Sequence, residues 1–119
     1  MAAHNELGKK GEQIAVDYLI ADNYEVLEVN YRFSRAEVDI IARKDGLLIF
    51  VEVKTRSSLK HGCPESGVNH KKVKLLMDTA YHYMEKINHD WEIRFDVIAL
   101  LFPKNRLPFL KHIKDAFVP

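Results

Sequence analysis

Two acidic residues and a lysine on neighbouring segments of this chain have the types and spacing of a site that cleaves phosphodiesters with a divalent metal ion. Asp39 lies in one extended apolar segment, and Glu52-Val53-Lys54 lies in the next. Carboxylates bind Mg²⁺ together with water and phosphate oxygens. A bound divalent ion makes water nucleophilic and polarises the phosphoryl group. We therefore treat Asp39, Glu52 and the Val53 carbonyl as candidate ligands of Mg²⁺ or Mn²⁺. Lys54 is a candidate catalytic residue that orients water or stabilises the phosphorus centre.

A tight turn between the two segments decides whether the acids meet. Asp45-Gly46 separates two runs rich in β-branched apolar residues, which favours a two-residue hairpin turn. In the resulting register Asp39 lies opposite Glu52. Carboxylates that face each other across a sheet repel, so the pattern favours a cation between them. The alternative is an exposed sheet face with alternating charge.

The same register makes a second prediction about the charged face of the hairpin. It sets Glu37 opposite Lys54, so we expect Glu37 to form a cross-strand pair with Lys54 or with Arg56. It also places Val38 on the apolar face with Ile40, because alternate residues of a strand share a face.

Hydrophobic periodicity predicts the elements that carry these residues. We expect helices and strands in the order α-β-β-β-α-β, with a short further strand at the end. The helices are expected at residues 5–22 and 67–88, and the strands at 24–33, 36–44, 47–55, 91–102 and 107–113. The fold class is thus α/β, with a mixed central sheet flanked by helices. At 119 residues the chain is expected to form a single domain, residues 1–119.

Composition narrows the class of protein. No apolar run reaches the ~18 residues of a membrane span, and the first residues lack a secretory signal. The only cysteine is Cys63, so no internal disulfide can form. These features favour a cytoplasmic protein without membrane contact. The net charge of +1 does not by itself indicate nucleic acid, but basic residues gather near the candidate site, with Lys10, Arg56 and Lys72 as candidate phosphate contacts. Ordinary solvated charge is the alternative for each.

Two further acids require an explanation. Glu12 lies at the edge of the apolar stripe of the first helix, within reach of the acid pair, and is either a fourth catalytic candidate or a solvated acid. Asp96 lies in a nearly continuous apolar strand, where a charge requires a partner. Arg94 shares its face, so we expect a structural ion pair.

Longer segments of the chain resemble the YraN family of endonuclease-like proteins, in the PD-(D/E)xK superfamily. The segments that carry the resemblance, in order over nearly the whole chain, include 8–12, 37–42, 50–56 and 94–97. One departure is Ala36, where the family usually has glycine.

The resemblance implies a restriction-endonuclease-like fold akin to Holliday-junction resolvases. It matches Glu12 to the acid of the first helix, Asp39 and Glu52 to the metal carboxylates, and Lys54 to the active-site lysine. It matches Lys71 to a basic residue of the second helix that contacts phosphate.

We therefore expect a metal-dependent endonuclease that hydrolyses DNA, with branched or single-stranded DNA as substrate. A homodimer is an option, by analogy with resolvases that make two cuts. The alternative is a non-catalytic nucleic-acid- or protein-binding module that retains the nuclease fold.

Overall fold

The computed structural model describes residues 2–57 and 70–116. In these ranges the chain forms two helices and five strands, in the predicted order. They are α1 (Ala2–Ala21), β1 (Glu25–Phe33), β2 (Ala36–Lys44), β3 (Leu47–Arg56), α2 (His70–Lys86), β4 (Ile93–Leu101) and β5 (Phe109–Ile113). The predicted α/β class is confirmed, and the short final strand is present. Cys63 and most of the loop predicted before the second helix lie outside the described residues.

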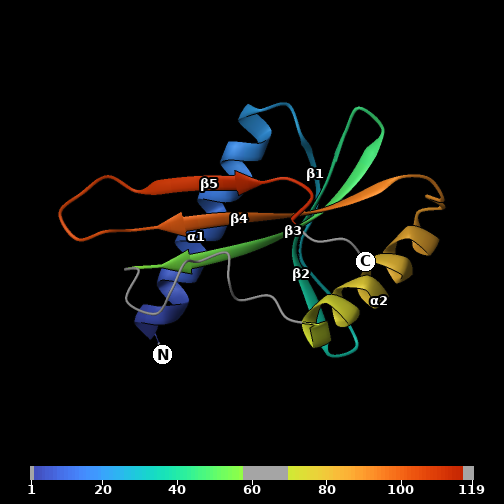
Figure 1. The fold of residues 1–119 in the computed structure, drawn as a ribbon, viewed down its shortest axis with the longest axis horizontal. Coiled ribbons are helices and arrows are strands. Elements are labelled where there is room, and N and C mark those ends of the chain that lie inside the picture. Colours follow the sequence, from blue (N-terminus) through green and yellow to red (C-terminus); the bar gives the residue numbers. More distant parts are fainter. Residues whose placement is uncertain (1, 58–69, 117–119) are drawn as a thin grey trace.

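The strands form one mixed sheet in the order β1-β2-β3-β4-β5. β3 and β4 are parallel, and the other neighbouring pairs are antiparallel. A parallel pair requires a crossover connection, which here contains α2. α1 packs on one face of the sheet and α2 on the other (Figure 1). Neither of these two helices, in the part of the chain that is described, is long and apolar enough to cross a membrane.

Each helix covers its own apolar cluster. The α1 cluster is built on residues from α1 and from the middle of the sheet, namely Ala15, Leu19, Tyr24, Ile40, Ala42, Ile49, Val51, Ile98 and Leu100. The α2 cluster contains Val38, Ile41, Leu48, Phe50, Leu76, Ala80, Tyr83 and Phe95. The prediction that Val38 shares a cluster with Ile40 is therefore wrong. Pairing between β2 and β3 stops at Ile40. Beyond that point Val38 of β2 packs in the α2 cluster.

The hairpin turn adopts the predicted backbone conformation. Asp45 and Gly46 have φ angles of 53° and 81°. Positive φ at both central residues is the requirement of a type I′ turn, which matches the twist of the flanking strands. The register runs from Lys44↔Leu47 to Ile40↔Val51, as predicted for these residues. The sequence of the turn thus fixes which residues of β2 and β3 are neighbours.

Gly11 allows α1 to lie close to the ends of β3 and β4. A methyl group on its Cα would overlap Thr55 Oγ1 and would lie 3.2 Å from Thr55 Cγ2 and 3.3 Å from Leu100 Cδ1. The space is therefore already filled by side chains of the sheet. Glu12, the next residue, is held beside the sheet as a result.

Substituting the two helical glycines should have opposite effects on stability. Alanine is favoured over glycine in a helix by about 1 kcal/mol, so Gly8→Ala, where nothing lies within 4 Å of the new methyl group, should stabilise the protein by up to that amount. Gly11→Ala should lose about 1 kcal/mol net, because overpacking costs about 1–3 kcal/mol. Urea denaturation of both variants measures the difference. Equal stabilisation by both would show that α1 has room to move away from β3.

Candidate metal and nucleic-acid site

The site lies in a fork between two strands of the hairpin. β2 and β3 diverge beyond the Ile40↔Val51 pair, as Figure 1 shows. Asp39, the next residue of β2, accepts a 2.7 Å hydrogen bond at Oδ2 from the Val53 N–H. The carboxylate thus bonds a backbone group of β3 where the ladder has ended. The predicted ladder pair between Asp39 and Glu52 is wrong in this detail, since pairing ends one residue earlier.

The two acids are nevertheless electrostatic neighbours. Burial, followed by the negative charge of Glu52, raises the pKa of Asp39 to about 7. The Val53 hydrogen bond acts in the opposite direction, and the charges of Glu12 and Glu37 add smaller increases. The fork therefore concentrates negative charge around one half-buried carboxyl group, as the sequence predicted.

Glu52 is the most deeply buried acid of the fork. It is 4% exposed, and its Oε2 lies 3.0 Å from Lys72 Nζ and 3.9 Å from Lys54 Nζ. Its other oxygen, Oε1, is buried and has no hydrogen-bond partner in the part of the chain that the structure describes. Leaving a buried acceptor unsatisfied costs about 1–3 kcal/mol, more for a charged group. Such an atom is a natural contact for a bound cation or water.

Two lysines from different elements share this carboxylate. Burial, followed by the neighbouring Lys72, lowers the pKa of Lys54 to about 8. Burial acts in the same direction on Lys72, but its hydrogen bond to Lys54 and the charge of Glu52 outweigh it and raise the pKa of Lys72. Of the two, Lys54 thus gives up its proton more readily near neutral pH. The sequence predicted Lys72 as a phosphate contact and missed its contact with Glu52.

Glu12 approaches the fork from α1. Its Oε1 accepts a 2.7 Å hydrogen bond from Asn30 Nδ2 of β1. Burial raises the pKa of Glu12, while the Asn30 bond lowers it and the charge of Glu37 raises it. Asn30 was not predicted as a site residue. Its only signal in the sequence was its place in residues 30–32, a further segment that resembles the family. The bulge in β1 makes its side-chain direction hard to read from alternation.

Glu37 has a different partner from the one predicted. Its Oε2 lies 2.8 Å from Arg32 Nη2, on the neighbouring strand β1. Arg32 and Glu37 are register partners there, whereas no ladder connects Glu37 to β3. The predicted pair with Lys54 or Arg56 is wrong because the fork separates β2 from that part of β3.

Ala36, where the family usually has glycine, pairs with Phe33 across the turn between β1 and β2. The residue of that turn with a left-handed backbone is Ser34, with φ 58°.

The carboxylate oxygens of the fork are suited to a magnesium ion that is bound by only a few protein ligands. Mg²⁺ is usually bound through one or two carboxylates, with water and substrate phosphate completing the shell. Asp39 and Glu52 supply two carboxylates, and Glu52 Oε1 is an acceptor that the described protein groups leave unused. Within residues 2–57 and 70–116 there is no group of three or more His, Cys, Asp or Glu that could hold a metal by itself. Val53 contacts Asp39 through its N–H, and its carbonyl remains a candidate ligand.

The basic candidates lie at different distances from the fork. Lys71 and Lys72 line a pocket of about 330 Å³ with Glu37 and residues of the adjoining turn and helix. Lys10 lies on the α1 side, with Nζ 5.4 Å from the centre of the Phe102 ring. Arg56, farther along β3, donates a 3.0 Å bond to the Thr55 carbonyl. Lys71 and Lys72 thus lie beside the fork, whereas Lys10 belongs to α1 and Arg56 to the end of β3.

The predicted Arg94–Asp96 ion pair is confirmed and lies apart from the fork. Arg94 donates from Nε and Nη2 to the two carboxylate oxygens of Asp96, each at 2.8 Å. His112 Nε2 lies 2.7 Å from Asp96 Oδ2, and its Nδ1 lies 3.0 Å from the Tyr18 hydroxyl. These groups hold α1, β4 and β5 together on the α1 face. Sequence spacing gave no signal for the two residues that join β5 and α1 to the pair.

Comparison with known proteins identifies the family. The model of the family described as "Uncharacterised protein family UPF0102" matches residues 11–100, so the chain belongs to UPF0102. The UPF0102 protein of Christiangramia forsetii is 50% identical over 118 residues, and that of Flavobacterium psychrophilum is 46% identical over 118 residues, each over 98% of both chains. The UPF0102 protein of Thermodesulfovibrio yellowstonii is 41% identical over 115 residues, covering 97% of this chain and 98% of its own. These descriptions name no activity.

Proposed function

We propose that this protein is an endonuclease of the PD-(D/E)xK superfamily, with a restriction-endonuclease-like fold, that hydrolyses DNA with Mg²⁺ or Mn²⁺. The observation that carries the proposal is the buried Oε1 of Glu52, which has no hydrogen-bond partner among the described residues, beside an Asp39 carboxyl with a raised pKa. Two acids crowded in this way destabilise a fold, and the lysines that contact Glu52 do so at Oε2 rather than at Oε1. A module that only binds nucleic acid would gain nothing from this arrangement.

The residues of the fork would divide the work of phosphodiester hydrolysis. A divalent ion, when bound, lowers the pKa of a water molecule and polarises the phosphoryl oxygen. Asp39 and Glu52 would hold it, and the Val53 N–H keeps the Asp39 carboxylate oriented. Lys54, held near Glu52, would stabilise charge on phosphorus or exchange a proton with the attacking water. Lys72 neutralises part of the Glu52 charge and lowers the pKa of Lys54.

DNA is the proposed substrate class, and a cytoplasmic location is part of the same proposal. The cations beside the fork, Lys71 and Lys72, favour contacts with a phosphate backbone. Branched or single-stranded DNA is favoured because the resemblance is to resolvases. Homodimerisation, which would supply a second centre for a second cut, belongs to the proposal as an analogy.

Calorimetry with Mn²⁺ tests the metal site directly. Wild-type protein should release heat on binding, and Asp39→Asn should bind at least roughly tenfold more weakly, because one of two charged ligands is lost. Lys54→Ala should keep the binding heat and lose cleavage by roughly 10²–10³-fold, since its role is in the transition state. Cleavage is measured on single-stranded, branched and duplex DNA with each metal.

The controls separate the two functional classes. Asp78→Asn removes an exposed acid of α2 and should change neither the heat nor the cleavage. Equal heats for wild type and Asp39→Asn would reject the metal site. Normal heats with no cleavage of any DNA would favour the binding module over the enzyme.

A further inference from the structure

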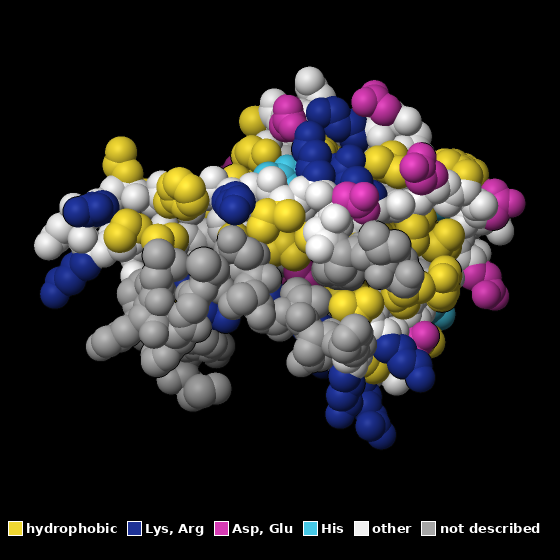
Figure 2. Space-filling model, viewed as in Figure 1, with side chains coloured by type: hydrophobic (Ala, Val, Ile, Leu, Met, Phe, Trp, Pro, Cys, Tyr) yellow, Lys and Arg dark blue, Asp and Glu magenta, His cyan; other side chains and the backbone are white. Residues whose placement is uncertain are grey.

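The hairpin formed by the ends of β4 and β5 carries apolar and basic side chains and no acid. We call residues 101–111 the β4–β5 arm; it extends beyond the rest of the sheet (Figure 1). Leu107 is 87% exposed and Phe109 is 60% exposed. The sequence has no Asp or Glu between residues 97 and 114, while it has Lys104, Arg106 and Lys111 in the arm itself. Figure 2 shows the arm covered by hydrophobic and basic side chains.

Strand register connects one face of the arm to the fork. Lys54 of β3 pairs with Ala99 of β4, which pairs with Lys111 of β5. In the next row Arg56 pairs with Leu101, which pairs with Phe109. Side chains of directly paired residues share a face. Lys54 and Lys111 therefore lie on one face, about 10 Å apart across two strand spacings, and Ala99 is the small residue between them.

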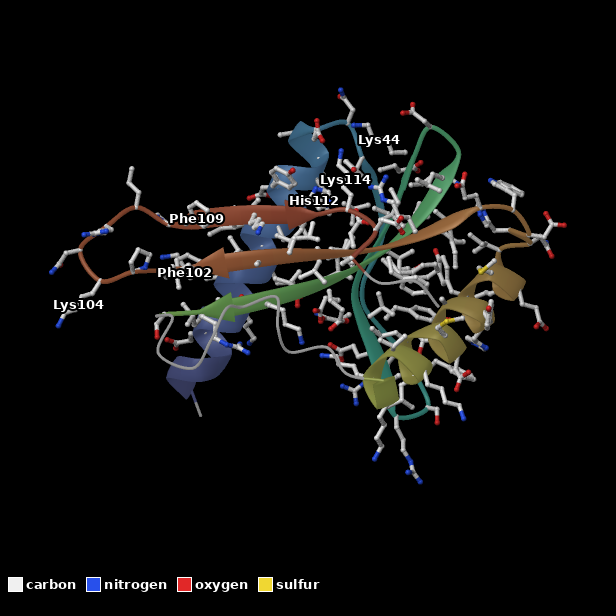
Figure 3. All side chains as sticks on the ribbon, viewed as in Figure 1. Lys44, Phe102, Lys104, Phe109, His112 and Lys114 are labelled. Carbon is white, nitrogen blue, oxygen red and sulfur yellow. The ribbon has the colours of Figure 1, made fainter. Side chains whose placement is uncertain are left out.

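Contacts on the other face support this assignment. Phe102 and Leu110 pack against the α1 cluster, so the alternate residues Phe109 and Lys111 point to the side where Glu52 and Lys54 lie. Figure 3 places Phe102, Lys104 and Phe109 along the arm. The face of the arm that continues the fork is thus an exposed aromatic ring beside a lysine, with further cations near the tip.

The positive charge of this face favours a nucleic acid over a second copy of the protein as its ligand. β5 is an edge of the described sheet, and an edge strand offers unpaired backbone groups to a second chain. Antiparallel pairing of two copies centred on Lys111 would place like charges opposite each other, which is unfavourable. A polyanion has no such penalty. A single strand also has unpaired bases that stack on aromatic rings, whereas the bases of a duplex are already stacked.

We propose that Phe109 and Lys111 form a subsite for single-stranded nucleic acid, which Phe109 holds by base stacking and Lys111 by phosphate contact. Lys111 lies in the same cross-strand row as Lys54, so a strand held here would lie on the face of the sheet that carries the acids. This inference rests on the proposed function for the destination of the strand. Binding at the arm itself is independent of whether the fork cleaves.

Fluorescence anisotropy in EDTA tests the subsite without metal or cleavage. A labelled oligothymidine should bind wild-type protein, and Phe109→Ala should bind it roughly tenfold more weakly, as expected for loss of one stacking platform. Lys111→Ala should weaken binding and reduce the dependence on salt by about one phosphate contact. Both side chains are exposed, so thermal unfolding should show folded variants.

Matched variants and a second measurement decide between the explanations. Tyr81→Ala removes an aromatic ring of α2 that is 54% exposed, and Lys114→Ala removes an exposed lysine beside Tyr24 and Arg94 on the α1 side. Neither should change the affinity. Equal affinities of wild type, Phe109→Ala and Lys111→Ala would overturn the subsite, as would an equal loss in Lys114→Ala.

The remaining outcomes separate the subsite from the nuclease. If wild type cleaves DNA and Phe109→Ala has the same affinity and the same cleavage rate, the nuclease proposal is supported and the subsite is rejected. Wild type that binds oligothymidine through Phe109 and cleaves none of the DNA substrates with either metal would support the subsite and reject the nuclease. A wild-type dimer that Phe109→Ala dissociates, with no oligothymidine bound, would identify a second copy as the occupant and overturn the proposal.

Discussion

In metal-free buffer at pH 8, the Asp39→Asn variant should be more stable than wild type by about 2 to 4 kcal/mol. The reason is that burial and the charge of Glu52 raise the pKa of Asp39 from 3.8 to about 7 in the folded protein. Each unit of pKa corresponds to about 1.4 kcal/mol. The variant amide keeps an oxygen for the Val53 N–H and carries no charge, so it escapes most of this penalty. Guanidinium denaturation in EDTA measures the difference.

The size of this difference should depend on pH in a defined direction. Because the folded pKa of Asp39 is raised, the folded state holds a proton that the unfolded state has lost between about pH 4 and pH 7. Wild-type stability from this group is therefore full below pH 4 and falls as pH rises through 7. Asp39→Asn should match wild type near pH 4 and exceed it most at pH 8. Titrating groups that do not interact with Asp39 cancel in the comparison.

Metal and a surface control complete this test. Mg²⁺ at pH 8 should stabilise wild type, because a ligand that binds only the folded state adds free energy of unfolding, and it should stabilise Asp39→Asn less. Asp78→Asn should stay within about 0.5 kcal/mol of wild type at both pH values, as expected for an exposed position. An Asp39→Asn variant that is no more stable than wild type at pH 8 would mean that the fork does not crowd its acids. The expected gain in stability of Asp39→Asn would come at the expense of the proposed activity, as is common at functional sites.

The sequence predicted the hairpin well because local chemistry determines it. Asp45-Gly46 suits a turn in which both residues have positive φ, and the turn fixes the register of the strands beside it. A register slipped by one residue would have turned one acid of the pair into the core. The observed register from Lys44↔Leu47 to Ile40↔Val51 has no slip, so both Asp39 and Glu52 reach the fork.

The details of the fork were not predictable from pairing rules. Extrapolating the ladder past Ile40 assumes that β2 and β3 stay together, whereas tertiary packing separates them. Because the strands separate, Glu37 forms an ion pair with Arg32, and the Asp39 side chain accepts a hydrogen bond from the Val53 N–H. Alternation along one strand contains no signal for where two strands part.

The partners of Asp96 show a second limit of sequence reasoning. Because a buried charge requires a partner, the sequence predicted an ion pair between Asp96 and Arg94, two residues away on the same strand. His112 comes from β5 and Tyr18 from α1, and only the folded topology brings them to Asp96. An ionised carboxylate only accepts hydrogen bonds, so His112 Nε2 donates to Asp96, and in the neutral ring Nδ1 accepts from the Tyr18 hydroxyl. The backbone N–H of Asp115 donates a further 3.0 Å bond.

Replacing Asp96 with asparagine should destabilise the protein by about 3 to 5 kcal/mol. The residue is fully buried, and its carboxylate is the acceptor for Arg94, His112 and the Asp115 N–H. An amide would face donors with its own NH₂ group and would leave the guanidinium without a counter-charge. Removing one member of a buried pair typically costs this amount, because the other charge stays buried. Urea denaturation at pH 7 measures the loss.

An exposed pair provides the control for this prediction. Glu25 and Arg43 form a 2.9 Å ion pair whose side chains are 62% and 44% exposed, so Glu25→Gln should cost less than about 1 kcal/mol. Burial alone would raise the pKa of Asp96, but the bonds from His112, Arg94 and the Asp115 N–H outweigh it and lower the pKa. The cost of Asp96→Asn should therefore persist above pH 4 and shrink as pH falls below the folded pKa. Equal costs for Asp96→Asn and Glu25→Gln at pH 7 would contradict a role for the buried network in joining α1, β4 and β5.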